Sequence, residues 1–278
     1  LTASDATSGV CQIRYSNDGI WDTEPWEDFS TTKTWTLTFG DGTKTVYCQI
    51  EDNAGLFSTT CFDTIMLDTI APAGSITIAQ DATYTNSTSA TLKLSADDAT
   101  SGISLMRFSN DNTTWTPWEP YSPSKTWTLT TGDGTKTVYA QYMDNAGSTS
   151  PIYQDTIVLD ATKPTANAGQ DQTVNVNIAV SFDARASTDN MGIVTYEWNF
   201  GDGTTGTGVT TTHTYANPGN YTVTLTVKDA AGNTATDQMT ITAQALPAEG
   251  FPMWIAGAAV VAIAVATVAI AILWKKRK

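Results

Sequence analysis

A repeat of about ninety residues constrains this fold more than any other feature. Residues 33–55, KTWTLTFGDGTKTVYCQIEDNAG, match residues 125–147, KTWTLTTGDGTKTVYAQYMDNAG, at an offset of 92. DTIMLD at residues 63–68 matches DTIVLD at residues 155–160 at the same offset. A unit of this length is too long for a solenoid repeat and suits an immunoglobulin-sized sandwich. The sequence therefore predicts two copies of one β-domain.

A third Gly-Asp-Gly-Thr turn, at residues 201–204, stands in different surroundings. YEWNF precedes it, and THTYANPGNYTVTLTV follows it. Asp-Gly is a strong signal for a two-residue hairpin, so we expect these turns to close hairpins. Alternating strands such as YTVTLTV (residues 221–227) recur between turns, and no long amphipathic helix pattern appears before residue 250. The fold class is therefore all-β, with a third domain of a different type.

Two family resemblances follow from these motifs. Residues 107–147 resemble the tandem Ig-like repeats of large bacterial and archaeal surface proteins, through their paired tryptophans, GDGTKTVY and D-x-AG turn. Residues 164–245 resemble a PKD domain, with YEWNFGDGT, HTYANPGNYTVTLTV and DAAGN in that family's order. The PKD resemblance implies a spacer or adhesion module without catalysis of its own. The C-terminal PAEGFPMW and LWKKRK are similar to the anchors of archaeal surface proteins.

The predicted organisation is three tandem Ig-like sandwiches and one transmembrane helix. Leu1 aligns with Leu94, which lies inside the second repeat, so we expect the first repeat to lack its first strand. We also expect the chain to be a C-terminal piece of a longer protein. An authentic start with a shortened sandwich is the alternative. The predicted parts are the first Ig-like repeat (1–72), the second repeat (73–163), the PKD domain (164–245), a linker (246–250), the membrane helix (251–274) and a basic cytoplasmic tail (275–278).

Residues 251–274 carry no charged side chain and would form a helix about 36 Å long, enough to cross a hydrocarbon core of about 30 Å. A buried core helix is the alternative, but four basic residues follow the run, which predicts a cytoplasmic tail and extracellular β-domains. The net charge is −14, and an acidic ectodomain argues against nucleic acid as a partner.

The three cysteines all lie in the first repeat, so the fold does not depend on them. Cys48 and Cys61 flank EDNAG almost symmetrically and could form a disulfide outside the cell, with Cys11 left over; free buried thiols are the alternative. One histidine and the lack of a Cys-x-x-Cys spacing argue against a zinc site.

Tryptophans are the candidates for a carbohydrate-binding surface. Trp115 and Trp118 lie in a predicted loop and could stack on sugar rings, whereas Trp35, Trp127 and Trp198 are expected in sandwich cores.

Calcium is the metal for which the sequence offers candidates, and they are Asp97, Asp98 and Asp189. Calcium needs six to eight oxygen ligands, and each interdomain linker offers a single acid. Residues 187–192 also lack one Asp of the pattern common in PKD domains. Turn capping by Asp is therefore the ordinary explanation, and no cofactor is expected.

No catalytic constellation stands out. His213 is the only histidine, the sequence has no Gly-x-Ser-x-Gly, and we expect His213 to make a structural hydrogen bond. Glycosylation sequons begin at Asn86, Asn112 and Asn220.

These features together predict a non-enzymatic, membrane-anchored stalk or adhesion segment of a larger cell-surface protein. Two alternatives stay open: a module that binds glycans or proteins through exposed tryptophans, and the anchor of an extracellular hydrolase whose catalytic domain lies upstream of Leu1.

Overall fold

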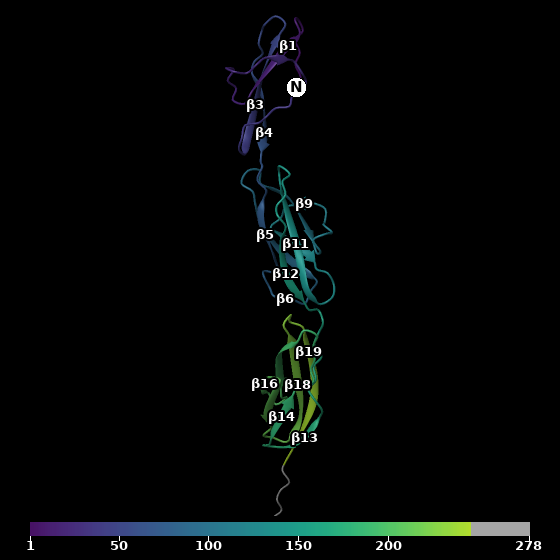
Figure 1. The fold of residues 1–278 in the computed structure, drawn as a ribbon. Coiled ribbons are helices and arrows are strands. Elements are labelled where there is room, and N and C mark those ends of the chain that lie inside the picture. The colour runs from purple at the N-terminus through teal and green to yellow at the C-terminus, as the bar shows by residue number, and fades with distance from the viewer. Residues whose placement is uncertain (246–278) are drawn as a thin grey trace, which may run out of the picture. The chain divides into compact units, whose positions relative to one another are not determined.

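The structure is a computed structural model that describes residues 1–245 (Figure 1). The predicted linker, membrane helix and tail, residues 246–278, lie outside the described residues. Residues 1–245 contain strands and turns, and they include no helix that could cross a membrane. The chain divides into two compact units, Leu1–Thr162 and Lys163–Lys278. The first unit holds both repeats, and the second begins at Lys163.

The strands follow the predicted repeats. The first repeat contains β1 (Val10–Ser16), β2 (Glu27–Asp28), β3 (Gly42–Asp52) and β4 (Cys61–Leu67). The second contains β5 (Ala73–Ile78), β6 (Tyr84–Thr85), β7 (Ser89–Asp97), β8 (Ile103–Ser109), β9 (Glu119–Pro120), β10 (Ser124–Thr128), β11 (Gly134–Asp144) and β12 (Tyr153–Leu159). The second unit contains β13 (Gln172–Asn175), β14 (Ala179–Asp183), β15 (Ile193–Asn199), β16 (Thr205–Thr207), β17 (Thr210–Thr214), β18 (Gly219–Asp229) and β19 (Thr234–Gln244).

The second repeat is a two-layer sandwich. One sheet has the order β10-β7-β5 and the other β6-β12-β11-β8-β9. Burial alternates along β7, where Ala90, Leu92 and Leu94 face the core while the residues between them are exposed. Alternation of this kind places one face of each strand between the two sheets. Residues of both sheets therefore share a single buried cluster.

The first repeat has one sheet, in the order β2-β1-β3-β4, which corresponds to the larger sheet of the second repeat. Residues 33–38, which match the β10 region, form no strand, because β10 pairs with β7 and the described residues of the first repeat offer no such partner. One face of the sheet is consequently left uncovered within residues 1–72. Ile65 on β4 is 56% exposed, whereas Ile157 at the same position of β12 is 1% exposed.

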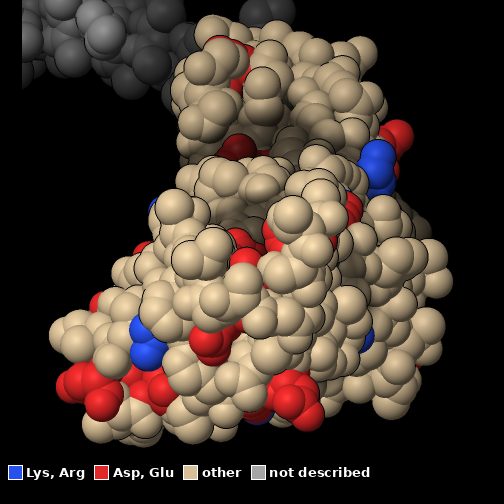
Figure 2. Space-filling view, turned by 90° about the horizontal axis from the view of Figure 1, so that it is seen from above, with Lys and Arg blue, Asp and Glu red and all other residues tan. Residues whose placement is uncertain are grey.

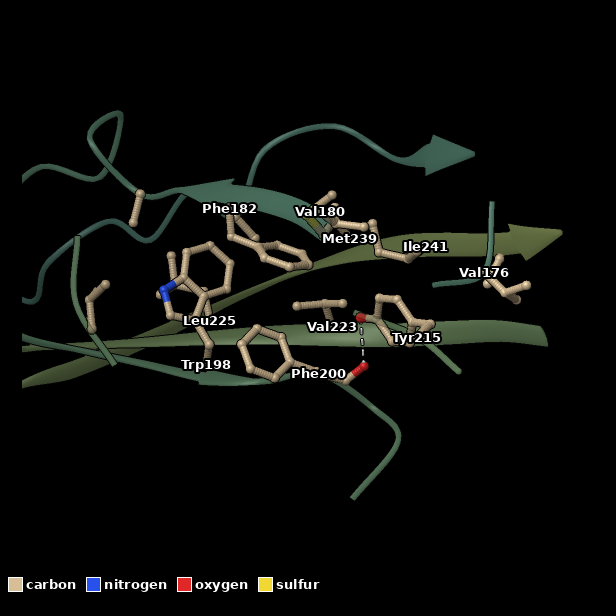
Figure 3. Packing of buried hydrophobic residues seen from close by; sticks show 14 residues of the cluster. Val176, Val180, Phe182, Trp198, Phe200, Tyr215, Val223, Leu225, Met239 and Ile241 are labelled. Atoms are coloured by element: carbon tan, nitrogen blue, oxygen red, sulfur yellow. Dashed lines mark hydrogen bonds between the residues drawn. The ribbon is translucent and has the colours of Figure 1, made fainter. Parts of the chain in front are cut away.

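The PKD unit packs a five-stranded sheet, β13-β19-β18-β15-β16, against the two-stranded sheet β14-β17. Trp198 is buried in this core, as the sequence predicted, and lies beside Phe182, Phe200 and Leu225 (Figure 3). Its Nε1 donates a hydrogen bond to the carbonyl of Gly208 at 3.0 Å. The hydroxyl of Tyr215 is also buried and donates to the carbonyl of Phe200 at 3.0 Å. The polar atom of each of these large buried rings therefore has a backbone carbonyl as its partner.

The Gly-Asp-Gly-Thr turn serves two topologies. In the PKD unit it joins β15 to β16, which pair with each other, so that copy closes a hairpin. In the second repeat the turn joins β10 of one sheet to β11 of the other, and the hairpin predicted there is wrong. β10 pairs with β7, and β11 pairs with β8 and β12. Positive φ angles at Gly132 (82°) and Gly134 (113°) allow the chain to cross between sheets at this point.

Candidate functional site

The aspartate of the turn holds the linker that follows each repeat. The carboxylate of Asp41 accepts hydrogen bonds from the backbone nitrogen of Thr69 at 3.0 Å and from its hydroxyl at 2.8 Å. Asp133, 92 residues later, accepts from the backbone nitrogen of Ala161 at 2.8 Å. A motif that reads as a turn signal thus also fixes the start of the next linker.

A cluster of three carboxylates lies where the linker after the first repeat meets the second repeat. Asp68 comes from the linker, Asp98 from the end of β7 and Asp144 from the end of β11, and one carboxylate oxygen of each lies within 4.8 Å of the other two. Sequence reasoning missed this site because it counted the acids of each linker alone. The antiparallel fold brings together residues that are 30 and 46 positions apart. The repeat offered a signal for two of the three acids, because Asp98 and Asp144 recur in the first repeat as Asp5 and Asp52.

Hydrogen bonds to backbone nitrogens keep Asp98 ionised. The nitrogens of Ser101 and Gly102 donate to Asp98 Oδ1 at 2.8 and 3.0 Å, and the bond from Ser101 is the main cause that lowers the pKa of this carboxyl. The Ser101 nitrogen also reaches Asp68 Oδ2 at 3.1 Å. No Lys, Arg or His nitrogen of residues 1–245 lies within 4.0 Å of the three carboxylates. Two negative charges about 5 Å apart repel each other by roughly 3 kcal/mol at an effective dielectric constant of 20.

The other calcium candidates do not join this cluster. Asp97 is exposed at the end of β7. Asp189 caps a loop of the PKD unit, where its Oδ2 accepts from the backbone nitrogens of Met191 and Gly192, both at 2.8 Å. A carboxylate oxygen of Asp189 also lies within 4.8 Å of one from Asp229 in the same unit.

The surface of the first unit carries few basic groups. On the face that Figure 2 presents, acidic side chains lie scattered among uncharged ones, and basic side chains are sparse. A surface on which acidic groups outnumber basic ones repels other copies of itself.

Trp115 and Trp118 enclose an arginine of their own repeat. The guanidinium carbon of Arg107 lies 4.8 Å from the ring centroid of Trp115 and 4.5 Å from that of Trp118, and both rings are half-buried. In the first repeat the guanidinium carbon of Arg14 lies 4.6 Å from the ring centroids of both Trp21 and Trp26. Cation–π contacts of this kind stabilise the loop, and the arginine covers one face of each ring. The repetition of the clamp in both repeats favours a structural role over sugar stacking.

Trp35 and Trp127 lie at the edges of their cores. Both are partly buried and pack against the buried clusters of their repeats. Each indole Nε1 donates to an asparagine side chain at 2.8 Å, to Asn17 in the first repeat and to Asn110 in the second.

His213 fixes the third Gly-Asp-Gly-Thr turn. Its Nε2 lies 2.7 Å from Asp202 Oδ2, and its ring stacks on Phe200 with centroids 4.2 Å apart. The hydroxyl of Thr204 and the His213 ring lower the pKa of Asp202 against the opposing effect of burial. Among residues 1–245 His213 has this one carboxylate partner, and no serine or cysteine nucleophile is hydrogen-bonded to it. The arrangement supports a structural role.

The structure joins Cys48 on β3 and Cys61 on β4 by a disulfide, and Cys11 is a free thiol. The two cysteines are directly paired across the strands, where the second repeat has Ala140 and Tyr153. The cross-link therefore strengthens the repeat that has the smaller core.

Removing this disulfide should lower the stability of the first repeat alone. The bond spans 13 residues, and closing a loop of about this length contributes roughly 3 kcal/mol in the chain-entropy account. We expect a Cys48→Ser and Cys61→Ser double variant to lose about 2–3 kcal/mol of unfolding free energy in the first repeat, measured by urea unfolding. Cys11→Ser is the control and should change little. An equal loss in both variants would mean that thiol packing, and not the cross-link, provides the stability.

The three sequon asparagines, Asn86, Asn112 and Asn220, are all exposed. Their side chains are therefore accessible to a glycosyltransferase, and their glycosylation stays a prediction.

Comparison with known proteins confirms the PKD domain. Residues 161–243 match the PKD domain family. Collagenase ColA of Bacillus cereus is 43% identical over 74 residues, which are 27% of this chain and 8% of that protein. The crystal structure of the PKD1 domain of Vibrio cholerae metalloprotease PrtV is 32% identical, with a TM-score of 0.26, and covers 30% of this chain and 99% of that domain.

The fibronectin(III)-like modules of Clostridium thermocellum CbhA are 16% identical, with a TM-score of 0.40, over 61% of this chain and 94% of theirs. The chain spans less than a tenth of the length of the collagenase that it matches. Taken with the fold, the match to the family model defines a chain of two related β-sheet repeats followed by a PKD domain.

Proposed function

We propose that this chain is a non-enzymatic stalk segment of a larger cell-surface protein, anchored in the membrane with its β-domains outside the cell. The proposal rests on the linker between the repeats, which forms hydrogen bonds with both the first and the second repeat. Thr69 is held by Asp41 of the first repeat, and Asp68 accepts a hydrogen bond from Ser101 of the second. A linker tied to both neighbours bends less than a free chain, which suits a spacer.

The membrane part of the proposal rests on the sequence of residues 251–278, outside the described residues. A charged side chain in mid-bilayer costs about 2.5–3.5 kcal/mol on insertion scales, and residues 251–274 contain none. Four basic residues follow the run, which favours a cytoplasmic C-terminus. The β-domains would then lie outside, where the Cys48–Cys61 disulfide persists.

Protease treatment of intact cells tests this topology. External protease should remove the β-domains and leave a small membrane-bound fragment that an antibody to the C-terminus detects. Ala264→Arg should lower the fraction of chain that resists high-salt extraction from membranes, and Ala248→Arg, outside the apolar run, is the matched control. β-Domains that stay intact on unpermeabilised cells would refute the proposal.

A second candidate function is that of an accessory segment of an extracellular hydrolase. It is favoured by the relatives, which include collagenases and a metalloprotease and extend far beyond the matched region. The two candidates differ in what the longer polypeptide does. An antibody to residues 163–245 should precipitate gelatin-degrading activity from solubilised source cells if the second candidate is right, and none if the chain belongs to a stalk alone.

A further inference from the structure

We propose that Asp68, Asp98 and Asp144 form a calcium site that ties the linker after the first repeat to the second repeat. The three carboxylates converge within 4.8 Å, and none of them has a basic partner among residues 1–245. A bound cation would neutralise charges that otherwise repel one another.

A second observation points to a ligand in this place. Asp144 is 2% exposed, and while its Oδ1 accepts from the backbone nitrogen of Ser148 at 2.8 Å, its Oδ2 is buried without a partner in the described part of the chain. The hydroxyl oxygen of Ser101, in the loop that carries Asp98, is likewise buried and lacks a partner there. A buried polar atom that makes no hydrogen bond is costly, so two of them beside three carboxylates indicate a missing partner.

The first repeat shows how the same residues satisfy one another when no linker acid is present. There the hydroxyl of Ser8, the counterpart of Ser101, donates to Asp5 Oδ2 at 2.8 Å and lies 3.0 Å from Asp52 Oδ2. Asp5 and Asp52 are the counterparts of Asp98 and Asp144. In the second repeat the acid of the linker, Asp68, is added and this bridge is not formed. The two oxygens thereby become available to an ion.

The chemistry of the donors selects calcium. The groups that converge are the oxygens of three carboxylates, and neither a His nor a Cys belongs to the cluster. Oxygen donors of this kind suit hard cations, and Ca²⁺ tolerates the irregular arrangement and completes six to eight ligands with water. Extracellular modules bind Ca²⁺ with Kd on the order of 10⁻⁴–10⁻³ M, so a site of this class would fill at millimolar calcium.

Calorimetric titration of CaCl₂ into the EDTA-treated full chain in detergent micelles tests the site. Asp189 and Asp229 approach each other in the PKD unit and could contribute calcium uptake of their own. The quantity to compare is therefore the difference in bound calcium between each variant and the native chain. Asp68→Asn and Asp144→Asn should each lose one binding equivalent relative to the native chain. The matched control is Asp52→Asn, the counterpart of Asp144 in the first repeat, which should keep that equivalent.

Thermal unfolding separates loss of the site from loss of the fold. Without calcium, Asp68→Asn should unfold at the same temperature as the native chain or higher, because it removes repulsion from the cluster and keeps an acceptor for Ser101. With about 10 mM CaCl₂ the native chain should gain several degrees in the transition of the second repeat, and Asp68→Asn should gain less than half of that shift. Equal calcium uptake and equal shifts in the native chain and in Asp68→Asn would overturn the proposal. The stalk function would stand in that case, because it does not depend on the ion.

Discussion

Trp198→Ala should cause a large loss of unfolding free energy in the PKD unit. The indole is 1% exposed, packs against Phe182 with ring centroids 5.4 Å apart, and donates its N–H to the carbonyl of Gly208. Truncating a buried tryptophan typically costs about 3–5 kcal/mol through lost burial and the cavity left behind. We expect calorimetry of the full chain to show a large fall in the transition temperature of the second unit, with the first unit unchanged.

Two variants separate the causes of this loss. Trp198→Phe keeps most of the ring volume and removes the hydrogen bond to Gly208. We therefore expect it to lower the unfolding free energy of the PKD unit by about 1–2 kcal/mol. Val194→Ala lies on the same strand at a position that is 59% exposed, and it should change stability by less than about 1 kcal/mol. A small effect of Trp198→Ala would mean that the PKD core repacks around the missing ring.

Ile157→Ala and Ile65→Ala should differ strongly although the two residues are equivalent in sequence. Ile157 is 1% exposed between the two sheets of the second repeat, and truncating it should cost about 2–5 kcal/mol. Ile65 is 56% exposed on a sheet with one uncovered face, and truncating it should cost less than about 1 kcal/mol, mostly through strand propensity. Urea unfolding of the two variants measures the difference. Equal losses would show that the face bearing Ile65 is covered in solution.

Much of the fold could be predicted from the sequence. The 92-residue offset, the alternation along strands such as β7 and the order of motifs after residue 163 indicated an all-β fold with an internal repeat and a PKD domain. These are local or periodic signals, and they persist whatever lies beside them in space. Trp198 was placed in its core for the same reason, because it stands at a fixed position in a strand before a recognisable turn.

The turns and the carboxylate cluster were harder to predict. An Asp-Gly signal specifies where the chain reverses, but the partner of each strand decides whether the reversal closes a hairpin, and those partners lie far away in sequence. The contact of Arg107 with Trp115 and Trp118 could not be predicted for the same reason, because Arg107 reaches the two rings only when its strand is in place.

The sequence by itself determined the class of the fold, the internal repeat and the apolar run after residue 250. Tertiary structure alone decided which acids meet. Asp68, Asp98 and Asp144 belong to three separate segments, and each one looks like an ordinary turn residue within its own segment. Charges act through space and not along the chain, so their environment is set only when the strands have paired and the linker has been fixed against the second repeat.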